Sequence, residues 1–119
     1  MIIGIGNDLI EIRRFENMKN KPEFAEKYFT EREVSASKGR SSFFAANFSV
    51  KESVSKVFGT GIRGFSLKEI EVLRDEYGKP YVNLYGRAEE LAEKLGIKTV
   101  HVSITDTSDL VMTMAVGED

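Results

Sequence analysis

The longest helical pattern in the chain is SSFFAANFSVKESVSKVF, residues 41–58. Ser41 or Ser42 can cap its beginning, and Gly59 can end it. Apolar side chains cover more than half of its circumference, which predicts a central and largely buried helix. The polar side chains inside this helix therefore stand out, and they are Asn47, Lys51, Glu52 and Lys56.

The elements on either side of this helix form a helical first half and a β-rich second half. Before it, the sequence predicts a buried strand over 2–5, after which the chain leaves the core at Asp8. Three short helices are predicted next: one over 11–18, one from Pro22 towards Phe29, and one that starts at the capping-box sequence 30–33. After it, we expect strands over 70–74 and 81–85, a helix over 87–95, and a hairpin of strands over 100–105 and 110–116. Met112 and Met114 are expected to lie in the core. The fold class is therefore α+β, with helices packed on a mainly antiparallel sheet.

Length and charge limit the classes of protein that fit. The 119 residues suit a single domain over 1–119. Seventeen Lys and Arg against nineteen Asp and Glu give a net charge of −2, which provides no overall attraction to nucleic acid or to an anionic membrane. No segment approaches the roughly 20 apolar residues that cross a bilayer. We expect a cytoplasmic protein.

The side chains available for chemistry are few. The chain has no cysteine and one histidine, which excludes disulfides, thiolate metal sites, cysteine nucleophiles and multi-histidine metal sites within one chain. Carboxylates, lysines, hydroxyls and backbone groups remain. Such groups suit Mg²⁺ and phosphate.

Two carboxylates, Asp8 and Glu52, occur in apolar surroundings. Asp8 follows an apolar strand and Glu52 interrupts an apolar helix, and such placements cost free energy unless a cation or a donor compensates them. The pair fits a Mg²⁺ ion that is also bound by substrate phosphate oxygens. A solvent-exposed ion pair between Glu52 and Lys56, four residues apart on the helix, is an equally good interpretation.

Two other patterns favour structural interpretations. Gly59–Gly64 matches G-x-G-x-x-G, but it follows a helix and precedes a strand, so a helix-terminating loop is favoured over a dinucleotide site. His101 lies on an alternating strand without the spacing of a Ser-His-Asp triad. A partly exposed strand histidine is favoured there over a catalytic one.

Five short motifs follow one another along the chain: GIGNDLIEI at 4–12, FSVKESVSK at 48–56, GTG at 59–61, GKP at 78–80 and VSI at 102–104. In order and spacing they resemble the motifs of bacterial holo-acyl-carrier-protein synthases, the small single-domain type of 4′-phosphopantetheinyl transferase. Each motif is weak alone, but the combination extends over essentially the whole chain and is highly specific.

The resemblance implies a fold, a reaction and partners. It implies the 4′-phosphopantetheinyl transferase fold and the Mg²⁺-dependent transfer of phosphopantetheine from coenzyme A to a serine of apo-acyl carrier protein. The second product is adenosine 3′,5′-bisphosphate, and the holo-carrier protein would serve fatty acid biosynthesis. Members of this family are typically homotrimers that bind coenzyme A in clefts between subunits.

The resemblance also implies residue roles. Asp8 and Glu52 would bind Mg²⁺, Glu52 would also be the candidate acceptor of the serine proton, and Lys56 would stabilise charge on a phosphate. The coenzyme A contacts would include Lys51, Lys56, Gly78, Lys79, Pro80, Ser103 and Thr107. The carrier protein would bind at Arg13, Arg14 and Met18, although a basic run of this kind is otherwise usually a solvated helix face.

Two positions depart from the family pattern. Asp106 occupies the place of a frequent histidine, and Asn47 the place of a frequent arginine. Both changes remove positive charge and bring the contacts to the 3′-phosphate of coenzyme A into question. They leave open an alternative function, a non-catalytic coenzyme A-binding or nucleotide-binding assembly protein on the same scaffold. A lesser alternative keeps the chemistry but uses another acceptor, such as a carrier domain of polyketide synthesis.

Overall fold

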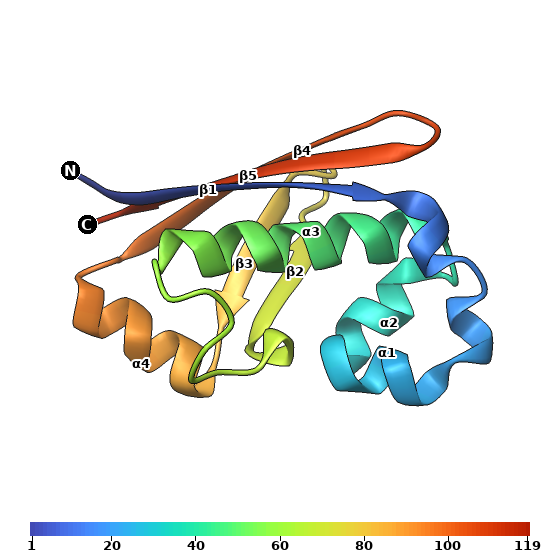
Figure 1. Cartoon of the computed structure of the whole chain (residues 1–119), viewed down its shortest axis with the longest axis horizontal. Helices are drawn as coiled ribbons and strands as arrows, with labels where there is room; N and C mark the ends of the chain where they lie inside the picture. Colours follow the sequence, from blue (N-terminus) through green and yellow to red (C-terminus); the bar gives the residue numbers. More distant parts are fainter.

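A long helix, α3 (Ser41–Val57), lies across one face of a three-stranded antiparallel sheet in the computed structural model, which describes residues 1–119 (Figure 1). The sheet has the order β1-β5-β4 and consists of β1 (Ile2–Glu11), β5 (Leu110–Glu118) and β4 (Thr99–Asp106). A second, two-stranded antiparallel sheet pairs β2 (Ile70–Arg74) with β3 (Pro80–Leu84). The predicted α+β class with mainly antiparallel strands is confirmed.

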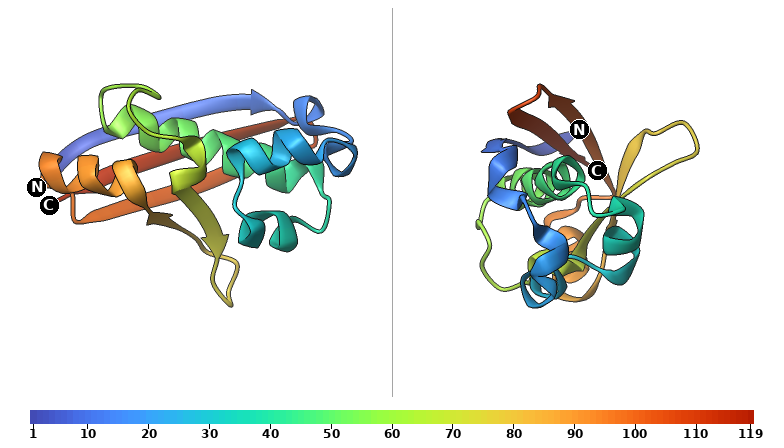
Figure 2. Two further views of the ribbon diagram at one scale, coloured as in Figure 1. Left: turned by 90° about the horizontal axis from the view of Figure 1, so that it is seen from below. Right: turned by 90° about the vertical axis from the view of Figure 1, so that its right-hand side faces the viewer.

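Shorter helices lie at the two ends of α3. At one end lie η1 (Ile12–Phe15), η2 (Met18–Asn20), α1 (Pro22–Tyr28) and α2 (Glu31–Ser37), whereas α4 (Gly86–Leu95) lies at the other end and η3 (Leu67–Glu69) precedes β2 (Figures 1 and 2). The capping box is confirmed, because the Thr30 side chain accepts from the Glu33 amide and the Glu33 carboxylate accepts from the Thr30 amide. No helix has the length and apolar character that a membrane span requires.

Several predicted boundaries are wrong. β1 continues to Glu11, so Asp8 lies within the strand, and the predicted helix over 11–18 is instead two short 3₁₀ turns. The residue that caps α3 is Arg40, whose side chain makes no capping hydrogen bond, and not Ser41 or Ser42. These differences are local and leave the order of elements unchanged.

The orientation of β5 is also the reverse of the prediction. Met112 and Met114 are 51% and 49% exposed on the outer face of the sheet. Thr113 faces α3 because its hydroxyl hydrogen-bonds with the hydroxyls of Ser49 and Ser53, at 2.8 and 2.6 Å. Since both sides of this strand carry apolar residues, periodicity alone does not distinguish the inner face from the outer one.

Two glycines set the distance between β1 and α3. A Cβ atom added at Gly6 would lie 1.9 Å from the carbonyl oxygen of Ser53, and one at Gly4 would lie 2.5 Å from that of Val57. Alternate residues of a strand share a face, so Asp8, the next residue on this face, also points towards α3. The close backbone contact therefore positions Asp8 against the helix.

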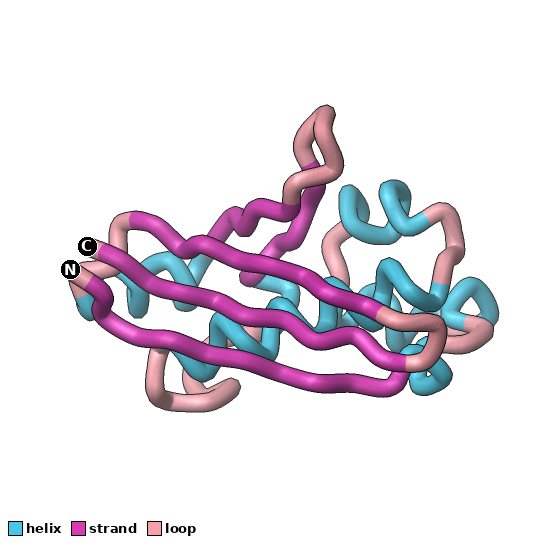
Figure 3. The backbone as a smooth tube through the Cα atoms, turned by 90° about the horizontal axis from the view of Figure 1, so that it is seen from above, coloured by secondary structure: helices cyan, strands magenta, loops and turns pink.

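The two sheets have different relations to β1. Seen from above, β1 is one edge of the three-stranded sheet, β4 is the opposite edge, and the β2–β3 hairpin lies beyond β4 (Figure 3). The turn of this hairpin projects away from the rest of the molecule (Figure 2). Residues on β1 and residues on the hairpin are therefore separated by the width of the sheet.

Candidate active site

Asp8 and Glu52 lie together between β1 and α3. Asp8 pairs in the sheet with Thr113, whose hydroxyl hydrogen-bonds with the hydroxyls of Ser49 and Ser53. On α3, Ser49 lies three residues before Glu52 and Ser53 directly after it. Burial raises the pKa of Glu52, the negative charge of Asp8 raises it further, and Lys56 and Arg14 lower it. The four side chains therefore share one electrostatic environment, which sequence spacing alone does not show.

Lys56 does not form the ion pair with Glu52 that was the alternative interpretation of this helix. The exposed Lys56 donates from Nζ to the main-chain oxygen of Asn7, at 2.7 Å. Neither Asp8 nor Glu52 forms an ion pair with any basic side chain of the chain. The ammonium group of Lys56 lies beside the residue that precedes Asp8, at the rim of the carboxylate pair.

The carboxylate pair has the chemistry of a divalent cation site. Both side chains are partly buried, carry like charges close together and have no ion-pair partner, an arrangement that a bound cation stabilises. Carboxylate oxygens are ligands that Mg²⁺ prefers, and Mg²⁺ is commonly bound by one or two carboxylates together with waters and phosphate oxygens. The residues present therefore fit the predicted ion.

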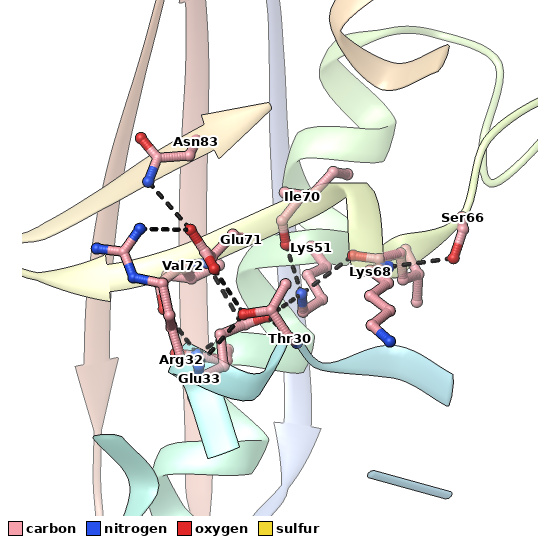
Figure 4. Close-up of polar contacts among 12 residues, drawn as sticks. Thr30, Arg32, Glu33, Lys51, Ser66, Lys68, Ile70, Glu71, Val72 and Asn83 are labelled. Carbon is pink, nitrogen blue, oxygen red and sulfur yellow. Dashed lines mark hydrogen bonds and ion pairs between the residues drawn. The ribbon is translucent and has the colours of Figure 1, made fainter. Parts of the chain in front are cut away.

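Lys51 has a different environment from the one predicted. Its side chain is 0% exposed, and its ammonium group donates to Glu33 at 2.8 Å, to the main-chain oxygen of Leu67 at 3.0 Å and to that of Ile70 (Figure 4). Burial lowers the pKa of Lys51, and the charge of Glu33 opposes this effect. All three N–H donors of the Lys51 ammonium group are used inside the fold. The predicted contact between Lys51 and coenzyme A is therefore wrong, and Lys51 has a structural role.

The sequence did not reveal the buried partner of Lys51. Glu33 was predicted only as the acidic residue that closes a capping box, yet its carboxylate also accepts from the Asn47 side chain at 2.8 Å. Asn47 donates in addition to the main-chain oxygen of Val72, at 2.9 Å. Asn47, one of the two departures from the family pattern, is therefore fully buried and connects α2, α3 and β2.

The predicted nucleotide contacts in the β2–β3 hairpin lie beyond β4, at the edge of the sheet opposite β1. Gly78 and Pro80 line a groove of about 350 Å³ together with Arg40, Phe43, Arg74 and Asp106. In the preceding turn, the Asp75 carboxylate accepts from the amides of Tyr77 and Lys79, at 2.8 and 2.9 Å. Asp8, Glu52 and Lys56 are absent from the lining of this groove.

Ser103 and Thr107 are exposed near this edge. Ser103 lies on the outer face of β4, and the Thr107 hydroxyl accepts from the amides of Asp109 and Leu110, at 3.2 and 3.1 Å. The site predicted from the sequence is therefore divided between two edges of the sheet (Figure 3). One chain brings Asp8, Glu52 and Lys56 together, but it does not bring them together with Gly78, Lys79 and Pro80.

The residues predicted to bind a carrier protein lie in η1 and η2, next to the carboxylate pair. The guanidinium carbon of Arg14 is 5.9 Å from the ring centroid of Phe48, one helical turn before Glu52. Arg13 is exposed and pairs with Glu11. Met18 is only 2% exposed and packs in the core, so it supports this surface from inside.

Comparison with known proteins identifies the class. A family model described as the 4′-phosphopantetheinyl transferase superfamily matches residues 4–115. The holo-acyl-carrier-protein synthase of Lachnoclostridium phytofermentans is 49% identical over 118 residues, 99% of this chain and 97% of that protein. The crystal structure of the holo-acyl-carrier-protein synthase of Neisseria meningitidis matches with a TM-score of 0.89 at 31% identity, over 100% of both chains.

A second solved structure carries a ligand. The holo-acyl-carrier-protein synthase from Bacillus anthracis, in complex with CoA (3′,5′-ADP), matches with a TM-score of 0.82 at 35% identity, over 100% of this chain and 98% of that one. The chain therefore belongs to the 4′-phosphopantetheinyl transferase superfamily and has its fold. Within the superfamily it is an enzyme of the holo-acyl-carrier-protein synthase kind, as the sequence motifs predicted.

Proposed function

We propose that the chain transfers the 4′-phosphopantetheine group of coenzyme A to a serine of apo-acyl carrier protein, in a Mg²⁺-dependent reaction that releases adenosine 3′,5′-bisphosphate. The observation that carries this proposal is the pair of partly buried carboxylates, Asp8 and Glu52, without an ion-pair partner and beside Lys56. The similar enzyme from Bacillus anthracis in complex with CoA supports coenzyme A as the substrate.

Asp8 and Glu52 would hold the Mg²⁺ ion. When bound, the ion supplies Lewis-acid stabilisation of the negative charge on the pyrophosphate of coenzyme A. Lys56 would turn its exposed ammonium group from the Asn7 oxygen to a phosphate oxygen and stabilise the charge that develops on the leaving phosphate.

Glu52 is our candidate for the acceptor of the serine proton. The serine oxygen would form a bond to the phosphorus that carries the pantetheine arm, and the bond from that phosphorus to the oxygen of adenosine 3′,5′-bisphosphate would break. A carboxylate that lies beside the reacting serine can accept its proton as a general base.

The carrier protein would dock on the surface of η1, beside the carboxylates. Arg14 lies close enough to Glu52 to lower its pKa, so an acidic partner that pairs with Arg14 would bring its serine to the same place. Arg13 is exposed next to it. Complementary charge of this kind mainly increases the association rate and the specificity.

The active site would be completed by a second copy of the chain in a homotrimer. The outer face of the three-stranded sheet carries exposed apolar side chains, among them Ile5 at 63%, Leu9 at 64% and Met112 at 51% exposure. A contiguous apolar face of this kind is typical of a protein–protein interface. Packing of such faces would bring the carboxylate pair of one copy near the hairpin groove of a neighbour, with coenzyme A between them.

The test is incubation with apo-acyl carrier protein, coenzyme A and Mg²⁺, followed by mass spectrometry of the carrier protein. The proposal predicts the added mass of one phosphopantetheine group, lost when a chelator removes Mg²⁺. Binding of coenzyme A without any mass gain on a competent carrier would instead favour the non-catalytic assembly protein. A gain only on carrier domains of polyketide synthesis would change the acceptor and keep the chemistry.

A further inference from the structure

Three buried hydroxyl groups, which we call the hydroxyl cluster, lie between α3 and the sheet beside the carboxylate pair. Ser49 and Ser53 of α3 are 0% exposed, and Thr113 of β5 is 1% exposed. The Oγ1 atom of Thr113 lies 2.8 Å from the Oγ atom of Ser49 and 2.6 Å from that of Ser53. One hydroxyl of the sheet is therefore hydrogen-bonded to two successive turns of the helix.

The hydroxyl cluster interrupts an apolar layer. On the inner face of β5, Thr113 lies between Val111 and Ala115, which are both 0% exposed and belong to the two hydrophobic clusters of the core. Exchanging both partners of a buried hydrogen bond for apolar groups of the same shape can be nearly neutral for stability. Packing alone therefore does not require hydroxyls here. What a satisfied buried polar network adds is a single defined arrangement of the elements that it joins.

The hydroxyl cluster connects the elements that carry the two carboxylates. Asp8 is the residue of β1 that pairs with Thr113, and directly opposed residues of antiparallel strands share a face. On the helix, Ser53 directly follows Glu52, and Ser49 lies three residues before it. A slide or a rotation of α3 that moves Glu52 away from Asp8 would therefore stretch the hydrogen bonds of Thr113.

The carboxylate pair needs such a restraint. Without a cation, the like charges of Asp8 and Glu52 repel each other, which favours separation of α3 from β1. The close contact between Gly6 and the Ser53 carbonyl limits how near the two elements come, but not how far apart they move. Mg²⁺ requires near-ideal octahedral geometry with oxygen ligands at about 2.0–2.1 Å, and ligands of this kind must be held to within about 0.5 Å.

We propose that Thr113 is a positioning residue for the Mg²⁺ site, whose hydroxyl holds α3 in the register at which Asp8 and Glu52 bind one ion. Thr113 acts through Ser49 and Ser53 and not as a ligand, because its hydroxyl is buried against these two residues. This inference rests on the proposed function, since that function gives the carboxylate pair its ion.

The test measures the response to Mg²⁺ in two ways. Thermal denaturation with Mg²⁺ alone gives the concentration at half of the Tm rise, and the transfer assay gives the concentration at half of the maximal rate. Thr113→Val keeps the shape of the side chain and removes its hydrogen bonds. It should raise both concentrations roughly tenfold, the lower end of the loss seen when contacts that orient metal ligands are removed. At saturating Mg²⁺, the KM for coenzyme A should stay close to that of the wild type.

Two further variants separate the hydrogen bonds from other effects. Thr113→Ser keeps the hydroxyl and should respond to Mg²⁺ nearly as the wild type does. Ser55→Ala is the matched control, because the Ser55 hydroxyl is also buried in α3 but donates to the main-chain oxygen of Lys51, 2.8 Å away within the same helix. It should leave the Mg²⁺ response unchanged. A response in Thr113→Ser as weak as that in Thr113→Val would overturn the proposed role of the hydroxyl.

The outcomes also distinguish this inference from the proposed function. A lower Tm in Thr113→Val with a wild-type Mg²⁺ response would assign Thr113 a structural role only and overturn the inference alone. A Tm response that weakens in Thr113→Val, without any transfer by the wild type, would overturn the proposed function alone. If Thr113→Val does not fold, the triple variant Ser49→Ala/Ser53→Ala/Thr113→Val decides, because it leaves no hydroxyl unpaired. It should show the weakened Mg²⁺ response, and a wild-type response would overturn the inference.

Discussion

The carboxylates of Asp8 and Glu52 come from different elements and meet because a strand without side chains at two positions can approach a helix closely. Gly4 and Gly6 allow β1 to lie directly against the backbone of α3. The pair is then partly buried without a basic partner, which is unfavourable for the fold and useful for binding a cation.

We predict that Mg²⁺ stabilises the folded chain through Asp8 and Glu52. Excess Mg²⁺ should raise the Tm of the wild type, because the ion binds the folded state. Asp8→Asn and Glu52→Gln should remove this rise and lower the transfer rate by at least about 100-fold, while leaving the Tm without Mg²⁺ equal or higher. Calorimetry with and without Mg²⁺ measures the shift. Glu76→Gln, in the exposed hairpin turn, is the control, and a Mg²⁺-dependent shift that survives in both variants would contradict the assignment.

We predict that the contribution of Glu71 to stability decreases in acid. Burial raises the pKa of Glu71, but hydrogen bonds from Thr30, Asn83 and Tyr85 and the charge of Arg32 outweigh it, so the net pKa lies below 4.5. A depressed carboxyl pKa contributes stability above the unfolded pKa that is lost as the pH falls through the folded value. The difference in unfolding free energy between the wild type and Glu71→Gln should therefore be constant near neutral pH and shrink in acid below about pH 4.5. Urea denaturation at several pH values checks this, and a difference that grows in acid would contradict it.

At the scale of elements, the buried cluster of Glu33, Asn47 and Lys51 joins α2, α3 and β2. Figure 4 shows Glu33 and Lys51 of this cluster. It fixes the helix that carries Glu52 and Lys56 relative to the β2–β3 hairpin. Lys51 and Glu52 are neighbours in sequence, but successive residues of an α-helix point about 100° apart. One side chain therefore enters the core while the other faces the site.

We predict that Lys51→Met lowers stability strongly and changes the KM for coenzyme A little. Removing one partner of a buried ion pair leaves an uncompensated charge and costs about 3–5 kcal/mol. The double variant Lys51→Met/Glu33→Gln should recover part of this loss, because the glutamine carries no charge. Chemical denaturation and steady-state kinetics provide the two readouts. Wild-type stability with a raised KM would return Lys51 to the ligand contacts.

The sequence was most informative where local chemistry decides the structure. The capping box at Thr30 and the proline at the start of α1 predicted those helices correctly, because both signals act within one turn. The outward-facing Met112 was missed because both faces of its strand are apolar, and the buried role of Lys51 was missed because its partner lies 18 residues away. Motif resemblance predicted the site residues, but the division of that site between two sheet edges depends on the strand order, which no local pattern encodes.

At the scale of the whole molecule, the carboxylate pair and the hairpin groove, which we propose as two half-sites, lie towards opposite edges of a sheet whose outer face is apolar (Figure 3). A chain of this length has little room for a deep cleft of its own. Assembly would both cover the apolar face and complete the active site. A variant that prevents assembly should therefore also lose transfer activity.

We predict that Met112→Lys converts the assembly to monomers and removes transfer activity. A lysine in the middle of the outer face would bury an unpaired charge in the interface. Light scattering and the transfer assay on the same sample test this. Tyr77→Lys, at an exposed position on the hairpin turn, is the matched control. A fully active monomer would contradict the proposed shared site.

We propose that one active site uses the carboxylate pair of one copy and the hairpin groove of another, which Arg40 and Arg74 line, and mixing of subunits is the sharpest test. The two variants are Glu52→Gln and the double variant Arg40→Met/Arg74→Met. Each is first assayed alone, at a coenzyme A concentration that leaves both nearly inactive. The two are then mixed, unfolded and refolded together, and the mixture is assayed. Random assembly should restore about a quarter of the sites to wild-type composition, with a matching gain in carrier-protein modification. Activity no greater than the sum of the separate variants, in a mixture shown to contain both, would contradict the claim.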